Sequence, residues 1–308
     1  MARPRSRVAD FAVYLAVRLV VCLVQALPYR AACAVAGGFA WLAYHLDRRH
    51  REVAHDNLRH AFGGQLTDAG RDRMVRAVYR HFCTLLVDII QLPRNLHPFT
   101  WRRHMDAPGI GRMVECLLSG RPLLLVTGHF GNWEAGGYVL AMLGFHTHAI
   151  ARRLDNPHLD AFLKRFRQGT GQHILDKNDD FDRIQAVLAH NGVLATLADQ
   201  DAGPRGLFVD FFGRPASTHK AVALLALEYD VPLLVTGVRK VGELRFEQVI
   251  EDAILPEEYA NRPDAVKAMT QRFTTALERV VRTAPEQYFW LHRRWKHQPA
   301  ARKAKQAA

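Results

Sequence analysis

Short apolar runs alternate with longer helix-compatible stretches from about residue 106 to residue 295, and this alternation restricts the fold more than any other feature. Apolar runs of about four to eight residues between turn residues are typical of buried strands. Strands that alternate with helices predict an α/β fold, with a central, mostly parallel or mixed sheet flanked by helices. The expected strands are 123–127, 148–151, 173–175, 193–197, 233–238 and 246–249, and the expected helices are 133–143, 157–169, 180–190, 218–229 and 263–283.

The segment before this core, residues 48–105, has a helical pattern. One helix is expected to open at Thr67 and to end at Pro93 and Pro98, because proline lacks the amide hydrogen that a helix interior needs. Its apolar residues recur at helical spacing, which predicts that they pack on the core.

The N-terminal 47 residues are apolar with basic flanks. Apolar stretches cover 11–27 and 31–46, Arg3, Arg5 and Arg7 precede them, and residues 48–51 are basic apart from one histidine. Arg18 would be unfavourable in the middle of a membrane-spanning helix and breaks a signal-peptide pattern. We therefore expect a membrane-associated hairpin or anchor, whose depth stays open, or alternatively a pair of core helices. The predicted segments are 1–47 (membrane association), 48–105 (helices packed on the core), 106–299 (α/β core) and 300–308 (basic tail).

The charge of the chain predicts an anionic partner. The formal net charge is +12, which suits an anionic membrane surface, an anionic substrate or nucleic acid. The apolar N-terminus argues against nucleic acid as the main partner. The four cysteines are scattered without a C-x-x-C pair, so we expect neither a disulfide framework nor a metal site.

The segment 128–137 carries the strongest sign of chemistry. It follows an expected buried strand, and Asn132 stands where the N-cap of the next helix is expected. The loop can fold His129 back over the first helical turn, where Glu134 lies. Glu134 would then hold one imidazole nitrogen and leave the other as a base for a hydroxyl. Because the chain has 16 histidines, a structural pair is the alternative.

Together these features resemble the lysophospholipid acyltransferase superfamily, and within it the bacterial lipid A (lauroyl and myristoyl) acyltransferase branch and its phosphatidylinositol mannoside acyltransferase relatives. The resemblance covers nearly the whole chain. Its strongest element is GHFGNWE at 128–134, the form that the His-x4-acid motif of the superfamily takes in this branch. Weaker matching segments follow in the same order at 152–157, 165–167, 197–204, 209–216 and 290–296.

The resemblance implies a direct acyl transfer in which His129 is the general base and Glu134 orients its ring. Backbone N–H groups of 131–134 are expected to stabilise the oxyanion. Arg152, Arg153 and Arg167 are expected to bind an anion, either a lipid phosphate or the phosphopantetheine end of the donor, and the alternative is a solvated basic helix face. Asp199 is expected to hold Arg167 or to position the acceptor, and the alternative is a structural carboxylate of the turn that follows it. Asn132 completes the expected substrate-binding set.

The implied reaction moves a fatty acyl group from an acyl thioester to a hydroxyl of a lipid A precursor or related glycolipid. The donor would be acyl carrier protein or coenzyme A, with no cofactor and no metal. The expected location is the bacterial inner membrane, with the active site on the cytoplasmic side. Alternatives are a phosphatidylinositol mannoside or lysophospholipid acyltransferase, a thioester hydrolase, and a non-catalytic basic membrane- or nucleic-acid-binding protein.

Overall fold

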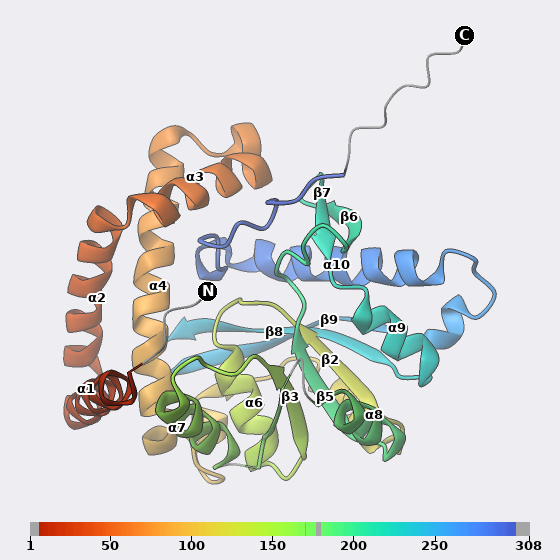
Figure 1. The fold of residues 1–308 in the computed structure, drawn as a ribbon, viewed down its shortest axis with the longest axis horizontal. Coiled ribbons are helices and arrows are strands. Elements are labelled where there is room, and N and C mark those ends of the chain that lie inside the picture. The colour runs from red at the N-terminus through yellow and green to blue at the C-terminus, as the bar shows by residue number, and fades with distance from the viewer. Residues whose placement is uncertain (1–5, 170, 177–179, 300–308) are drawn as a thin grey trace.

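A seven-stranded sheet forms the centre of the protein (Figure 1). The structure is a computed structural model that describes residues 6–169, 171–176 and 180–299, so the expected tail 300–308 lies outside the described residues. The helices are α1 (Arg7–Ala26), α2 (Tyr29–Leu46), α3 (Arg48–Phe62), α4 (Asp68–Asn95), α5 (Ile110–Leu118), α6 (Trp133–Met142), α7 (Pro157–Gln168), α8 (Phe181–Ala189), α9 (Ala221–Glu228) and α10 (Ala265–Thr283). The strands are β1 (Met105–Asp106), β2 (Leu123–Thr127), β3 (Thr147–Ala151), β4 (His173–Asp176), β5 (Val193–Leu197), β6 (Leu207–Phe211), β7 (Arg214–Thr218), β8 (Leu233–Gly242) and β9 (Arg245–Ile254).

The strand order is β1-β9-β8-β2-β5-β3-β4, and only the β8–β9 pair is antiparallel. This order confirms the predicted α/β class with a mostly parallel sheet. Successive side chains of a strand point to opposite faces. Leu124 and Val126 of β2 accordingly pack with α8, α9 and α10, whereas Leu123 and Leu125 pack with α5 and α6. In Figure 1, α10 and α6 lie on opposite sides of the sheet.

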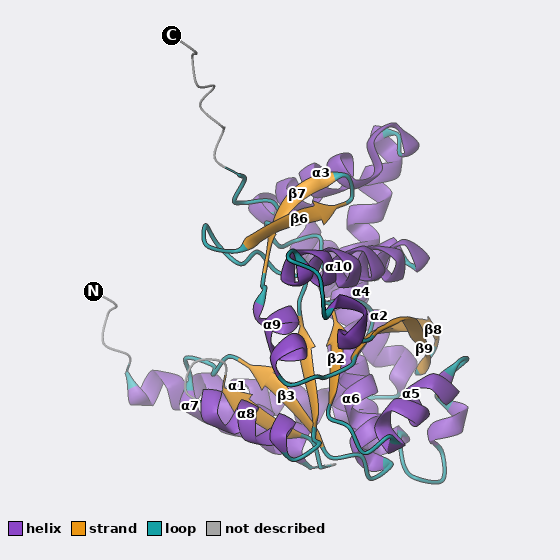
Figure 2. Ribbon diagram, turned by 90° about the vertical axis from the view of Figure 1, so that its right-hand side faces the viewer, coloured by secondary structure: helices purple, strands orange, loops and turns teal. Residues whose placement is uncertain are grey.

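The N-terminal helices form a second packed region. Residues of α2, α3 and α4 share a core with the end of α10, the β6–β7 hairpin and the last described segment of the chain. Figure 2 shows this hairpin beside α10, apart from the main sheet. The hairpin was not predicted, and neither were α5 and β1.

Helix α4 begins as predicted and ends later. The Thr67 side chain accepts a hydrogen bond from the Gly70 amide, so Thr67 is the expected N-cap. The helix runs through Pro93, the first of the two prolines at which its end was predicted, and ends at Asn95, before the second. A proline in the last turn removes only one intrahelical hydrogen bond, the one that an amide at position 93 would donate to the Ile89 carbonyl.

The predicted apolar N-terminal helix is present as α1. Among the described residues it is the one helix long and apolar enough to cross a membrane by length and composition, and none of its residues is buried. The second apolar stretch forms α2, which packs along α4.

Candidate active site

The loop between β2 and α6 is fixed by its backbone at the carboxyl end of the sheet. The Gly131 amide donates to the Gln287 carbonyl (2.9 Å), and the Asn132 amide donates to the Val238 carbonyl (2.7 Å). Gly131 has a φ of +58°, and a Cβ atom there would lie 1.8 Å from the Val238 oxygen. Only glycine fits this position, because any larger residue would force the loop away from β8.

Asn132 is the N-cap of α6, as predicted. Its side-chain oxygen accepts from the Ala135 amide at 3.0 Å, and the residue has no exposed surface. This buried place differs from the substrate contact that we expected of Asn132. The residue shapes the turn that carries His129 and holds the start of the helix that carries Glu134.

His129 is held by Asp199. One oxygen of the Asp199 carboxylate lies 2.8 Å from His129 Nδ1, and the other accepts from the His129 backbone amide at 2.8 Å. Asp199 is almost fully buried, whereas about a quarter of the His129 side chain is exposed. Among the described residues none hydrogen-bonds His129 Nε2. The imidazole therefore has one nitrogen fixed by a carboxylate and the other available to a substrate.

The predicted partner of the ring, Glu134, is therefore replaced by Asp199. The reason is the sheet register, in which Thr127 of β2 pairs with Leu197 of the neighbouring β5. His129 and Asp199 each lie two positions beyond these paired residues, so parallel pairing brings them to the same height at one edge. Gly128 allows the close approach, since a Cβ atom there would lie 3.2 Å from the Asp199 side chain.

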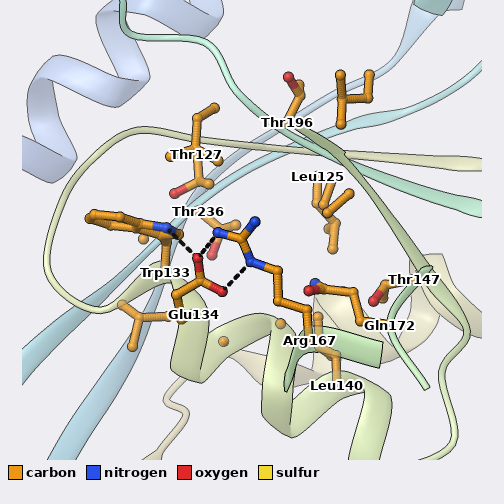
Figure 3. Close-up of a pocket in the computed structure, with 18 of the residues that line it drawn as sticks. Leu125, Thr127, Trp133, Glu134, Leu140, Thr147, Arg167, Gln172, Thr196 and Thr236 are labelled. Atoms are coloured by element: carbon orange, nitrogen blue, oxygen red, sulfur yellow. Dashed lines mark hydrogen bonds and ion pairs between the residues drawn. The ribbon is translucent and has the colours of Figure 1, made fainter. Parts of the chain in front are cut away.

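Glu134 instead binds Arg167 of α7, as Figure 3 shows. Arg167 Nε donates to one Glu134 oxygen at 2.9 Å, and its terminal nitrogen donates to the other. The Trp133 indole also donates to Glu134, at 3.2 Å. A two-point guanidinium–carboxylate pair fixes both side chains in orientation as well as position. The arginine that we expected near Asp199 is thus held by Glu134, and the two carboxylates exchange their predicted partners.

The charges around His129 favour its protonated form. Burial alone lowers the pKa of His129, but the charge of Asp199, its hydrogen bond to the ring and the charge of Glu134 outweigh burial and raise the pKa. Burial raises the pKa of Asp199, but the charge of His129 and the hydrogen bonds with it outweigh burial and keep the pKa of this carboxyl below its ordinary value. The pair can thus accept a proton on the ring and stabilise the imidazolium that results.

An apolar slot opens beside this pair, between α6 and the sheet (Figure 3). Most of its walls are small or aliphatic, and Trp133, Glu134, Arg167, Gln172 and Gln248 also line it. Trp133 joins the slot to the base, because its ring lies 5.2 Å from the His129 ring. Among the residues that line the walls are Leu125, Gly136, Gly137, Leu140, Ala149 and Ala195.

Arg152 and Arg153 lie on the loop after β3, outside the slot. Arg153 forms an ion pair with Asp176 (2.9 Å), and the exposed Arg152 pairs with Asp155 (3.3 Å). Together with Arg167 they line a small hollow on the surface of α7. The expected basic group is therefore assembled, although only Arg167 reaches the slot.

Three residues that the sequence did not single out support the site, two through their side chains and one through its backbone amide. His81 of α4 lies with Nε2 3.2 Å from the Gly131 carbonyl, the Asn57 amide of α3 donates to the carbonyls of Trp290 and His292, and Phe289 donates its backbone amide to the His129 carbonyl. A signal for His81 existed, because it is a polar residue at helical spacing between Val78 and Leu85, on the buried face of α4.

The burial of His81 predicts a pH-dependent stability. Burial lowers its pKa to about 4, the hydrogen bond to Gly131 opposes this shift, and the charge of Lys240 adds to it. Because the folded pKa lies below that of the unfolded chain, stability is full above about pH 6.5 and is lost as the pH falls towards 4. The loss attributable to His81 is at most about 3 kcal/mol.

Chemical denaturation of detergent-solubilised protein at pH 7 and pH 4.5 measures this loss. His81→Gln keeps a hydrogen-bond donor without titrating, so the pH dependence of its unfolding free energy should be shallower than that of the wild type. The exposed His97→Gln serves as the matched control and should follow the wild type. Equal pH dependence in all three proteins would contradict a buried neutral His81.

Proteins of similar sequence identify the family of this chain. The chain matches the family described as "Bacterial lipid A biosynthesis acyltransferase" over residues 2–297. It is 25% identical over 281 residues to the lipid A biosynthesis palmitoleoyltransferase of Escherichia coli, across 89% of this chain and 87% of that protein. It is 26% identical over 291 residues to the lauroyltransferase of the same organism, across 91% and 90%.

A phosphatidylinositol mannoside acyltransferase of Mycobacterium tuberculosis is 28% identical over 132 residues, which cover 42% of each chain. The relatives named here are all acyltransferases. The family match extends over the N-terminal helices as well as the α/β core. The chain therefore belongs to the bacterial lipid A biosynthesis acyltransferase family and is an acyltransferase.

Proposed function

We propose that this protein moves a fatty acyl group from the thioester of acyl carrier protein or coenzyme A to a hydroxyl of a lipid A precursor or closely related glycolipid. The observation that carries the proposal is an imidazole with one nitrogen fixed by a buried carboxylate and the other available, beside an apolar slot. The first is what general-base activation of a hydroxyl requires. The second suits a hydrocarbon chain.

His129 Nε2 removes the proton of the acceptor hydroxyl as its oxygen attacks the thioester carbonyl carbon. Asp199 keeps the Nδ1–H side of the ring in place and stabilises the imidazolium. When the tetrahedral intermediate collapses, the carbon–sulfur bond breaks and the new ester carbon–oxygen bond remains. The leaving thiolate takes the proton from His129, so the base is regenerated and no acyl-enzyme forms.

The oxyanion is stabilised by two of the four backbone amides, 131–134, that the sequence suggested. The amides of Gly131 and Asn132 are already bonded to Gln287 and Val238, so these two cannot serve. Trp133 and Glu134 occupy the first turn of α6, where amides lack an intrahelical partner. These amides and the charge of Arg167 are the groups that we assign to the oxyanion. Glu134 then acts by holding Arg167 at the slot.

The slot takes the acyl chain of the donor, and the basic hollow takes the anionic part of its carrier. Arg152, Arg153, Lys164 and Arg167 line this hollow, where they outnumber the carboxylates of Asp160 and Asp176. The net charge of +12 suits an acidic carrier protein as well as an anionic membrane. The same positive charge would attract both the acidic carrier protein and the anionic membrane.

We place the protein at the cytoplasmic side of the bacterial inner membrane. Large apolar side chains of α1 and α2 are exposed, among them Phe11, Leu19, Phe39 and Trp41. Such a surface is unusual for a soluble protein and suits the boundary between headgroups and acyl chains. The basic residues at the start of α3 follow directly, where anionic headgroups attract them.

A membrane-fraction assay tests the reaction. Radiolabelled acyl carrier protein and a tetra-acylated lipid A precursor are supplied, and we expect a labelled, more highly acylated lipid. The same assay with acyl coenzyme A identifies the carrier. A phosphatidylinositol mannoside acceptor is included because one group of relatives bears that name. Labelled fatty acid without labelled lipid would instead establish a hydrolase.

A further inference from the structure

A second apolar cavity lies away from the slot, between α1, α4 and α7. It is an open groove of about 750 Å³. Figure 1 shows α1 beside α4 and α7, and Figure 2 shows α1 running alongside α7. Val17 and Val20 of α1 line it, as do Ile89 and Ile90 of α4 and Phe162 and Phe166 of α7.

The groove is a built feature, because α1 is fixed to the body at both ends. Near one end the buried Asn156 side chain donates to the Asp10 carbonyl at 2.8 Å. Near the other end the buried Gln91 side chain donates to the carbonyls of Val24 (3.0 Å) and Leu27 (3.2 Å). These anchors are about 21 Å apart along the helix. Buried side-chain amides of α4 and of the α7 N-cap that donate to α1 keep this helix, and therefore the groove, in place.

Two arginines stand in the apolar lining. Arg18 donates to the Tyr14 hydroxyl (3.0 Å), and its guanidinium lies 5.1 Å from the centre of the Phe162 ring. Arg165 donates to the Ala161 carbonyl. Within the described part of the chain neither arginine forms an ion pair with a carboxylate. Two cations beside an apolar groove complement a molecule that has both an anionic group and a hydrocarbon chain.

The apolar surface of α4 connects this groove to the catalytic residues. Phe82 contacts Phe289 (5.0 Å between ring centres) and Trp133 (6.5 Å), and both of these rings contact His129. Leu86 follows Phe82 by one turn and lines the groove together with Ile90. The path from Phe82 to Ile90 measures about 12 Å along the helix. The groove therefore begins one turn of α4 away from Phe82, whose ring contacts the aromatic rings beside His129.

We propose that the groove binds a hydrocarbon chain of the acceptor lipid, with Arg18 and Arg165 at an acceptor phosphate. This inference rests on the proposed function and assigns the two apolar spaces to different substrates. The slot holds the chain that is transferred, and the groove holds a chain that the acceptor already carries. A lipid seated in this way presents its headgroup hydroxyl towards His129.

A matched pair of substitutions on α1 tests the groove. Val20 lines the groove, whereas its neighbour Leu19 lies outside it, and both side chains are exposed. Val20→Trp fills the groove and should raise the acceptor KM about tenfold, so that the ratio of acyl transfer to donor hydrolysis falls about tenfold. Leu19→Trp introduces the same indole group on the surface outside the groove and should keep the wild-type ratio.

The phosphate contact is tested separately. The double variant Arg18→Gln and Arg165→Gln should lose the preference of the wild type for a phosphorylated over a dephosphorylated acceptor. Equal ratios in Val20→Trp and Leu19→Trp, or an unchanged phosphate preference in the double variant, would overturn the proposal. Vesicle co-sedimentation of the Val20→Trp variant provides a further check. If weaker membrane binding alone accounted for its altered ratio, the groove would serve membrane binding and not the acceptor chain, and the proposal would be overturned. Absence of transfer in the wild type would instead refute the proposed function.

Discussion

His129→Asn should lower kcat for acyl transfer by about 10²- to 10⁴-fold, the range that a positioned general base contributes. Asparagine keeps much of the shape of the ring but cannot accept the hydroxyl proton. The backbone amide of residue 129 still reaches Asp199 in this variant, so the loop should keep its fold. The transfer assay described above measures the loss, with kcat and the acceptor KM determined separately.

The exposed His190→Asn is the control for this substitution, because His190 ends α8 far from the slot. It should retain wild-type kcat. A His129→Asn enzyme whose kcat stays within tenfold of the wild type would show that another group takes the proton. Thermal unfolding of both variants separates a chemical loss from a folding defect.

Asp199→Asn should lower kcat by on the order of 10³- to 10⁴-fold, as loss of the ring-orienting carboxylate does in His–Asp pairs. It should also move the pH dependence. Activity needs neutral His129, so it falls as the pH drops below the raised pKa of this residue. Removing the charge that contributes most to raising that pKa should shift the acid limb of the profile to lower pH.

Glu134→Gln is the matched comparison, since it removes a charge that contributes less to the pKa of His129. Its main effect should come through Arg167, which loses its two-point partner. We expect a smaller shift of the acid limb and a loss in kcat/KM that Arg167→Lys reproduces. If Glu134→Gln moved the acid limb further than Asp199→Asn, Glu134 and not Asp199 would be the functional partner of the ring.

The local sequence pattern was sufficient to predict most strands of the central sheet. The runs 123–127 and 193–197 were predicted with the bounds of β2 and β5, because a buried parallel strand is a continuous apolar stretch between turn residues. The β6–β7 hairpin escaped this pattern. Its strands include Asp210, Arg214 and Pro215, and its turn places Phe212 at a φ of +55°, which is uncommon for a residue other than glycine.

The sequence indicated which residues lie together at the slot better than it indicated which of them bind one another. His129, Glu134, Arg167 and Asp199 all lie at or beside the slot, yet the two carboxylates have each other's expected partners. Spacing along the chain favoured the near neighbour, Glu134. The pairing with Asp199 depends on β5 lying next to β2, although β3 and β4 come between them in the chain. A single sequence does not contain that strand order.

The attachment of the catalytic loop to Gln287 and Phe289 has a consequence for biosynthesis. His129 and Asp199 leave the ribosome early, but the carbonyl and the amide that hold their loop belong to the last described segment of the chain. Asn57 binds that same segment from the N-terminal side. A nascent chain that stops before residue 287 therefore has its reactive groups without the frame that aligns them. Activity should therefore begin only after residues 287–289 have been synthesised and have packed on the loop.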